Sequence, residues 1–336
     1  TFTGVTFSPY TAMPQPFTLR NTQGTHIIYA QSEDASGTRS PTYSASVVLD
    51  GVAPAMPNIV INGGRAFTNQ PNPLALTLTA TDLPTSGVDT VSGLSLVRLS
   101  ESNATDTQGR LTATAQSYLR DLPFVPMSLM DGSKTIYAQF VDNAGNSSAV
   151  ISSSIVVDTA KPTGTLSIAR GPAATVDGFT NTALVSLTLT AGMEPNGGSV
   201  QVRLANSSSG LSVATLQALQ TQQSWLLDPS SQGQKTIYAE LEDSAGNTSI
   251  VLTSNITYDT APPTMATLTL VSRNGQTVTL GVGAQDSSGL SPTQALTVSE
   301  DTLFLAAGTV GPQAMPTPAQ VNFALSTGDE VGSAIR

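Results

Sequence analysis

The sequence predicts an all-β protein built from tandem two-sheet β-sandwiches. Three observations lead to this prediction: a pattern that returns about every hundred residues, apolar residues that alternate with period two, and turn-forming residues between the alternating runs. Alternation with period two places one set of side chains on the buried face of a strand. A repeat of this length corresponds to a whole domain rather than to one unit of a solenoid.

The repeat is clearest in a segment that occurs three times. Each copy starts with glycine, carries Ile-Tyr-Ala at its centre and ends with aspartate, at residues 24–34, 132–142 and 233–243. A turn and a second alternating run follow each copy, and this run closes on another aspartate, at Asp50, Asp158 and Asp259. Glycine and asparagine in the turns tolerate positive φ, so each pair of runs is expected to form an antiparallel hairpin.

An earlier strand also recurs in every repeat. Apolar residues alternate there with other residues, mostly threonine and serine, in the runs 74–80, 185–191 and 278–284. The count comes to about seven short strands in each hundred residues, which is typical of an immunoglobulin-like or fibronectin-III-like sandwich. One helix-like stretch, residues 213–220, is interpreted as a connecting segment.

These patterns predict four parts along the chain. They are the C-terminal part of an Ig-like domain at 1–50, complete Ig-like domains at 51–158 and 159–259, and the N-terminal part of another at 260–336. The linkers, such as residues 158–162, are too short to let neighbouring domains tumble freely. We therefore expect an elongated rod, cut from a longer repeat protein or completed by other copies of the chain.

The closing half of the repeat resembles the bacterial Ig-like repeats of large secreted and surface proteins, which are often adhesin-like. The matching pattern is a G-x-K-T-I-Y-A strand, then D-x-A-G-N-x-S, then a strand that closes on D-T-x-x-P. It is nearly complete at 132–162 and 233–263, whereas Ser36-Gly37-Thr38 replaces the A-G-N in the first copy. The resemblance implies an extracellular, cell-surface or secreted location and a role as spacer, stalk or binding tip.

The composition of the chain limits the kinds of partner that it can bind. The formal net charge is −10, and lysine and arginine are scattered, so the clusters that bind nucleic acid are missing. No apolar run reaches the roughly 18 residues that a membrane span needs, so no membrane insertion is expected. The sequence holds no cysteine, which disfavours antibody-type domains of eukaryotes but not bacterial ones.

No catalytic constellation emerges from the sequence. His26 is the only histidine, which disfavours a Ser-His-Asp triad and excludes a multi-histidine metal site within one chain. It stands where the repeat has Lys134 and Lys235, so we expect a surface residue of a strand. The carboxylate pairs Glu33–Asp34 and Glu242–Asp243 could serve a glycosidase, but they recur at the end of a repeated strand. A residue that recurs in the repeats is expected to have a structural role rather than a catalytic one. We therefore expect that the chain is not an enzyme and that calcium is the one cofactor to consider.

Calcium is the one metal that the sequence brings into consideration. The junctions between consecutive repeats carry Asp50, Asp158 and Asp259. The hairpin turns carry Asp142 and Asp243. Calcium takes six to eight oxygen ligands, and junction aspartates of this kind could stiffen a rod. The simpler alternative is that these aspartates accept hydrogen bonds from the backbone of their own turns.

Two functions remain after these exclusions. The first is a non-catalytic structural or adhesive repeat region, a stalk or binding module of a bacterial surface protein or fibre. The alternative is an accessory Ig-like binding region of a secreted polysaccharide-degrading enzyme. The expected partners are neighbouring Ig-like domains, a cell-surface protein or glycan, or other copies of the chain joined head to tail. In that last case residues 1–50 would supply the strands that residues 260–336 lack.

Overall fold

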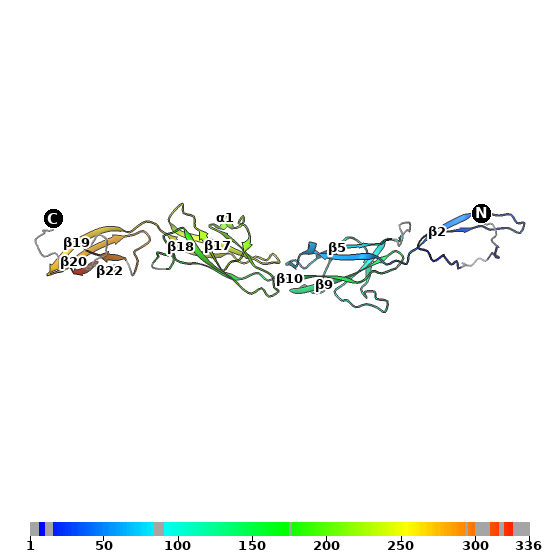
Figure 1. Cartoon of the computed structure of the whole chain (residues 1–336), viewed down its shortest axis with the longest axis horizontal. Helices are drawn as coiled ribbons and strands as arrows, with labels where there is room; N and C mark the ends of the chain where they lie inside the picture. The colour runs from blue at the N-terminus through cyan, green and yellow to red at the C-terminus, as the bar shows by residue number, and fades with distance from the viewer. Residues whose placement is uncertain are drawn as a thin grey trace. The chain divides into compact units, whose positions relative to one another are not determined.

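The computed structural model describes residues 7–10, 16–83, 91–174, 177–292, 295–299, 310–315 and 319–324. They fall into two units, Thr1–Ala160 and Lys161–Arg336 (Figure 1). Almost all regular structure in the described residues is β-strand, which confirms the predicted all-β fold. The expected division into four parts is finer than these two units and stays a prediction.

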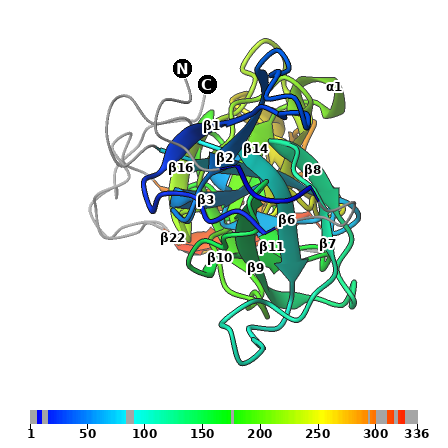
Figure 2. The same ribbon diagram turned by 90° about the vertical axis from the view of Figure 1, so that its right-hand side faces the viewer.

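Most of unit 1 is a sandwich of two sheets. One sheet has the order β3–β5–β8, with strands Ala55–Ile61, Leu74–Thr81 and Asp121–Phe124. The other has the order β4–β10–β9–β6–β7, with strands Phe67–Thr68, Ile151–Val157, Gly132–Asp142, Leu94–Ser100 and Ala115–Ser117. The two layers can be followed in two views at right angles (Figure 1, Figure 2). Apart from β4, which pairs in parallel, neighbouring strands are antiparallel.

The core between these sheets follows the predicted alternation. Ile136, Ala138 and Phe140 of β9 are fully buried and face the buried leucines of β5. Full burial of one such large apolar side chain stabilises the fold by about 1.5–3 kcal/mol. Tyr118 packs edge-on against Phe140 with ring centroids 5.7 Å apart. Its hydroxyl donates to the Leu78 carbonyl at 3.1 Å, which ties the end of β7 in one sheet to β5 in the other.

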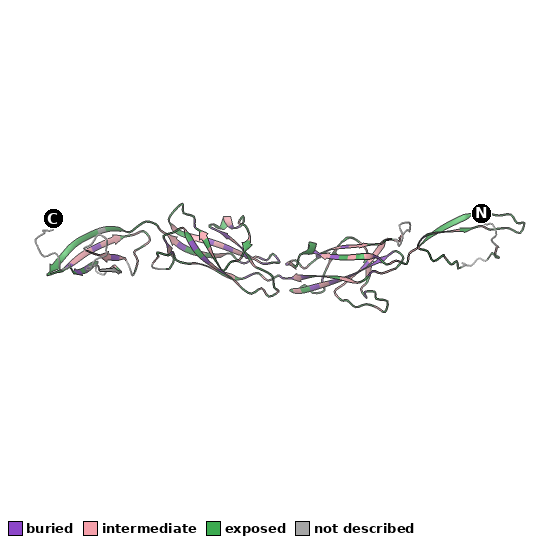
Figure 3. Ribbon diagram, in the orientation of Figure 1, coloured by how far each residue is buried: buried purple, intermediate pink, exposed green. Residues whose placement is uncertain are grey.

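Unit 2 repeats this arrangement. One sheet has the order β11–β13–β16, with strands Gly164–Ile168, Leu184–Ala191 and Gln222–Leu226. The other has the order β12–β18–β17–β14–β15, with strands Phe179–Thr180, Leu252–Tyr258, Gly233–Glu242, Gln201–Ala205 and Gln217–Ala218. The short helix α1, Ser208–Leu211, lies in the connection after β14. Buried residues concentrate on the strands of both sandwiches (Figure 3).

Further strands complete each unit. Unit 1 also contains the two-stranded hairpin β1–β2, Gly24–Ala30 and Tyr43–Leu49. Unit 2 also contains the sheet β19–β20–β23 and the pair β21–β22. These strands are Thr264–Asn274, Thr277–Gln285, Gln320–Ala324, Leu296–Val298 and Val310–Gln313. Val282, Leu296 and Val321 form a small core among them.

Three hairpins share one register. In each, the opening glycine pairs with the last residue of the returning strand: Gly24 with Leu49, Gly132 with Val157, and Gly233 with Tyr258. All three glycines have positive φ, between 106° and 120°, a region that other residues rarely adopt. Glycine therefore recurs at this position for a conformational reason, and it marks the start of the same hairpin in each copy.

Candidate metal centre

The hairpin turns are held by aspartate side chains. Asp142 Oδ1 accepts the Asn146 backbone N–H at 2.9 Å, and the Asn146 side-chain amide donates to Asp142 Oδ2 at 2.8 Å. Asp243 and Asn247 make the same two bonds at 2.9 and 2.8 Å. Each carboxylate oxygen has two lone pairs. These turn bonds therefore leave acceptor capacity on the carboxylates of both aspartates.

The aspartates that close the second strand of each hairpin also hold a turn. Asp50, Asp158 and Asp259 each accept, through Oδ1, the backbone N–H two residues ahead, at 3.0, 3.1 and 2.8 Å. The turn after each hairpin is thus stabilised locally. Asp158 is buried directly after β10. A calcium ion at Asp158 would have to bind a carboxylate that already accepts this turn bond.

Three carboxylates of unit 1 meet at one point. Oxygen atoms of Asp50, Asp82 and Asp142 all lie within 4.8 Å of one another. Asp50 follows β2, Asp82 follows β5 of the first sheet, and Asp142 ends β9 of the second sheet. The cluster therefore joins the segment that enters the sandwich to both of its layers.

Backbone donors fix two of the three side chains. The Ser92 N–H donates to Asp50 Oδ2 at 2.8 Å, and the Gly93 N–H donates to Asp82 Oδ2 at 2.6 Å. The Asn146 amide donates to the Asp50 carbonyl at 3.1 Å, so the hairpin turn also contacts the entering segment. The carboxylates are held in place by the fold and do not need an ion to bring them together.

The negative charge of this cluster is not offset by an ion pair among the described residues. Asp82 Oδ1 is buried and has no hydrogen-bond partner in the described part of the chain. Burial raises the pKa of Asp82, and the charges of Asp50 and Asp142 raise it further. Burial also raises the pKa of Asp50, but hydrogen bonds from Ser92 and Val52 outweigh this effect and leave the pKa below its ordinary value. The ion pairs found among the described residues involve none of these three aspartates.

The donor set suits a hard divalent cation. Calcium binds oxygen ligands at about 2.3–2.6 Å, so ligands on opposite sides of the ion are about 4.6–5.2 Å apart. Carboxylate oxygens within 4.8 Å of one another can therefore share one ion without rebuilding the site. A bound cation would also give Asp82 Oδ1 the partner that it lacks.

The structure assembles only part of the residue set that the sequence singles out. Asp50 and Asp142 come together, and the residue that joins them, Asp82, was missed. A signal for it exists, because an acidic residue stands shortly after the equivalent strand in each repeat: Asp82, Glu194 and Asp286. In unit 2, carboxylate oxygens of Asp243 and Glu194 also lie within 4.8 Å.

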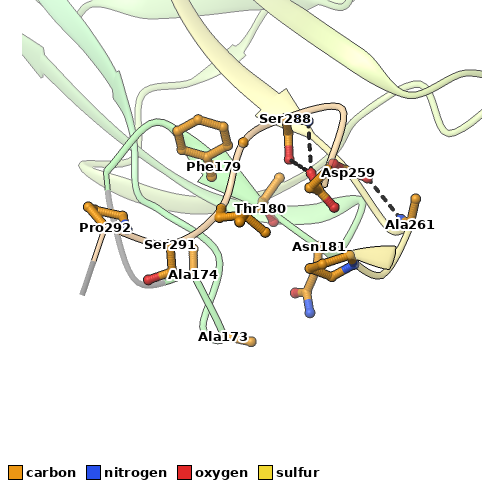
Figure 4. Close-up of a pocket in the computed structure, with 14 residues that line it drawn as sticks. Ala173, Ala174, Phe179, Thr180, Asn181, Asp259, Ala261, Ser288, Ser291 and Pro292 are labelled. Atoms are coloured by element: carbon orange, nitrogen blue, oxygen red, sulfur yellow. Dashed lines mark hydrogen bonds between the residues drawn. The ribbon is translucent and has the colours of Figure 1, made fainter. Parts of the chain in front are cut away.

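Asp259 lies at a pocket of about 470 Å³ in unit 2 (Figure 4). Phe179, Thr180 and Asn181 line one side, and the loop after β20 lines the other. Asp286, in that loop, accepts both the N–H and the hydroxyl of Ser288 at 2.8 Å. These Ser288 bonds lower the pKa of Asp286, and a smaller lowering comes from a hydrogen bond with the Asp259 carboxyl. Two carboxyl groups therefore meet here, where unit 1 has three.

One member of each carboxylate pair considered for glycoside hydrolysis is engaged in an ion pair. Glu33 binds Arg39 at 2.8 Å, and Glu242 binds Arg203 at 2.5 Å. The Glu33–Arg39 pair closes the loop between β1 and β2, and the Glu242–Arg203 pair links β17 to β14. His26 lies on β1 and contacts the Thr22 carbonyl at 2.7 Å. Among the described residues, no helix has the length and apolar character that a membrane crossing requires.

Comparisons with known proteins agree with this architecture. The model of a family described as bacterial Ig-like domain matches residues 41–159 and 175–260. No curated protein sequence matches the chain.

Solved structures similar to the chain include three multidomain β proteins. The fibronectin(III)-like modules of Clostridium thermocellum CbhA are 14% identical over 60% of this chain and 94% of theirs, with a TM-score of 0.34. The FN1–FN3 domains of chicken CNTN1 are 11% identical over 81% and 89%, with a TM-score of 0.30. The D00–D0 domain of Intimin is 15% identical over 61% and 100%, with a TM-score of 0.23.

Proposed function

Because this chain belongs to the family of bacterial Ig-like domains, we propose that it is a stalk or binding module on the outside of a bacterial cell. Domains of this family are typically non-catalytic. The repeats would then act as structural spacers that carry or present a binding surface.

The observation that carries the proposal is the acidic cluster of Asp50, Asp82 and Asp142. A calcium ion at this point would bind the segment that enters the sandwich and both sheets of the sandwich at once. Its ligands would include Asp82 Oδ1, the oxygen without a hydrogen-bond partner. When bound, the ion supplies the positive charge that three neighbouring carboxylates lack.

Such a cluster would make the stiffness of a stalk depend on its surroundings. Without the ion, repulsion among the carboxylates opposes the packing of the entering segment, and with it the same carboxylates hold that segment. Calcium concentrations are high outside cells, and extracellular calcium modules bind with dissociation constants of about 10⁻⁴–10⁻³ M. The proposed site is therefore suited to a protein that is exported before it becomes rigid.

The test is thermal unfolding of the chain in EDTA, in CaCl2 and in MgCl2. Calcium is expected to raise the unfolding temperature in a concentration-dependent way, because a ligand that binds only the folded state stabilises it. Magnesium is expected to do less, since it requires a small octahedral site and keeps its water. Identical curves in EDTA and CaCl2 would remove the calcium proposal.

Surface exposure needs a separate experiment. Antibodies raised against the chain are expected to label intact cells of the source bacterium. Labelling that requires lysis of the cells would contradict the proposed location and leave the calcium measurement unaffected.

A further inference from the structure

A polar cavity of about 330 Å³ lies on the outer face of one sheet of the unit 2 sandwich. Three residues of β17 line it: Gln234, Thr236 and Tyr238. They alternate along the strand with Ile237 and Ala239, which are fully buried in the core. The lining side chains of β17 therefore point away from the core and form the floor of the cavity.

The segment that follows β14 forms one wall. Strand β14 pairs with β17, and its last residue, Ala205, lies opposite Tyr238. The next three residues, Asn206, Ser207 and Ser208, all line the cavity. Helix α1 begins here and contacts both β14 and β17, so the wall is carried on the outer face of the sheet (Figure 1).

Another part of the wall carries one acidic and one basic side chain, Asp228 and Lys235. The Ser230 N–H donates to Asp228 Oδ1 at 3.0 Å, and the Lys235 ammonium donates to the Ser231 hydroxyl at 3.0 Å. Hydrogen bonds from Ser230 and, to a smaller extent, the charge of Lys235 lower the pKa of Asp228, so this group is a carboxylate at neutral pH. The two opposite charges leave the cavity without a net charge.

The fold holds the wall in place and leaves polar groups of the floor available. The Asn206 amide donates to the Leu226 carbonyl at 3.0 Å, and its Oδ1 accepts the indole N–H of Trp225 at 2.7 Å. Trp225 itself packs against the core of the sandwich. Within the described part of the chain, the Tyr238 hydroxyl and the Gln234 amide have no hydrogen-bond partner. A ligand can therefore bond to them without displacing a protein contact.

We propose that this cavity binds one ring of a neutral sugar. Sugar hydroxyls both donate and accept hydrogen bonds, and the lining offers hydroxyl groups, amides and a carboxylate that match both roles. Tyr238 is the one aromatic residue among the eight that line the cavity, and its ring presents apolar surface to the C–H face of a sugar. A volume at the lower end of the roughly 300–1,000 Å³ of small-molecule sites suits a single ring.

The same lining disfavours other classes of ligand. Apart from Tyr238, the lining residues are polar or charged, so a lipid chain or an apolar peptide side chain would find little to pack against. An anionic ligand would meet the carboxylate of Asp228. The sugar gives a ligand class to the binding role proposed above, and in this respect it rests on that role.

Unit 1 supplies a matched comparison within the same chain. Tyr137 stands on β9 where Tyr238 stands on β17, and both are partly buried. The surroundings differ, because Met127 stands where unit 2 has Asp228, and the Met127 N–H donates to the Glu101 carboxylate. The tyrosine alone is therefore common to both sandwiches, whereas the acidic group beside it belongs to unit 2.

The sole tryptophan of the chain gives a local readout of binding. Trp225 donates to Asn206, so a sugar that contacts Asn206 changes the surroundings of the indole. The whole chain is titrated in EDTA with the methyl glycosides of glucose, galactose, mannose and N-acetylglucosamine, and tryptophan fluorescence is recorded. A saturable change is expected with at least one of them. Cellobiose and N-acetyllactosamine, added to the panel, distinguish a plant polysaccharide from an animal cell-surface glycan as the source of the ring.

Matched acidic probes test the charge of the ligand. The methyl glycosides of glucuronic and galacturonic acid differ from the neutral ones only at C6. They are expected to bind at least about tenfold more weakly than their neutral counterparts, because their carboxylate meets that of Asp228. Tighter binding of the acidic probes would overturn the neutral class of ligand.

Three variants locate the site. Tyr238→Phe keeps the ring and loses one hydroxyl, so binding is expected to weaken about twofold to tenfold. Asp228→Asn removes the charge from an exposed side chain, and it is expected to weaken the neutral sugar about fivefold and to narrow the preference over the acidic probe. Tyr137→Phe is the control and is expected to bind as the wild type. Melting temperatures verify that each variant is folded.

Two results would overturn the sugar site: no response to any neutral probe, or a response that neither Tyr238→Phe nor Asp228→Asn changes. Neither result touches the calcium cluster, which lies in unit 1 and is measured separately by unfolding. Sugar binding that persists in a chain without calcium stabilisation and without surface labelling would instead remove the proposed function and leave the sugar site standing.

Discussion

At the scale of single residues, Asp82 is the most informative side chain of the chain. It combines a buried oxygen without a partner and two neighbouring carboxylates, and its pKa is raised for both reasons. A residue of this kind destabilises the fold on its own and becomes useful once a cation is bound. The effect of substituting Asp82 on the stability of the fold should therefore be opposite in EDTA and in CaCl2.

Asp82→Asn is expected to stabilise the chain in EDTA by about 1 kcal/mol, because the neutral amide removes the repulsion between Asp82 and the carboxylates of Asp50 and Asp142. In CaCl2 the same variant is expected to lose most of the calcium-induced rise in unfolding temperature. Thermal unfolding in the two buffers measures both effects. Asp121→Asn is the matched control, because Asp121 is exposed on β8 in the same unit and its side chain accepts a hydrogen bond from the Thr77 hydroxyl.

The gain in EDTA should also depend on pH. A carboxyl whose pKa is raised on folding contributes stability that is fully present below its ordinary pKa of 3.8 and is lost as pH rises through the folded value. Asparagine has no such dependence. The advantage of Asp82→Asn over the wild type should therefore grow between about pH 4 and pH 7. An advantage that shrinks over this range would contradict the account of Asp82.

At the scale of elements, the hairpin turn with its Asp–Asn pair recurs in both sandwiches. Asn247 is buried, and its side chain donates to Asp243 Oδ2 while its N–H donates to Oδ1. Asn247→Ala removes the side-chain donor and leaves a buried carboxylate oxygen short of a partner. It is expected to lower the free energy of unfolding of unit 2 by about 1–3 kcal/mol in chemical denaturation.

Asn255→Ala provides the comparison for this turn. Asn255 lies exposed on β18 of the same hairpin and accepts one hydrogen bond from the Thr236 hydroxyl. Surface substitutions of this kind usually stay within about 0.5 kcal/mol. Equal effects of the two alanine variants would show that the Asp243 bond contributes little.

The strands and hairpins could be predicted from the sequence because their signals are local. Ile136, Ala138 and Phe140 show the period of a strand, and the glycine and asparagine turns mark where it returns. The stretch 213–220 is where local reasoning was weakest. Helix α1 lies earlier, at Ser208–Leu211, where the Ser207 hydroxyl accepts the Gly210 N–H, and residues 217–218 pair with β14 instead.

The acidic cluster could be predicted only in part, because it depends on which loops meet in space. Asp50 and Asp142 were recognisable by their place in the repeat. Asp82 follows a strand of the other sheet, and its approach to Asp142 is set by the packing of the two layers. A comparison of the residues after each equivalent strand would have pointed to it, since Glu194 and Asp286 stand in similar positions.

At the scale of the whole molecule, the chain carries a formal net charge of −10. Salt screens the repulsion among these charges, with a Debye length of about 10 Å at 0.1 M. The unfolding temperature in EDTA is therefore expected to rise when NaCl is raised from about 20 mM to about 500 mM, because like charges in a compact chain repel one another. A fall in the unfolding temperature would instead indicate a fold held by opposite charges.

The common register of the three hairpins has a consequence for how such a protein can change its length over generations. A genetic exchange that joins the first half of one hairpin to the second half of another keeps the opening glycine opposite the closing residue. The hybrid would retain the same inward positions and the same turn. Recombination between copies can therefore add or remove whole repeats without inventing a new strand pairing, and the number of repeats becomes a heritable quantity that selection can adjust.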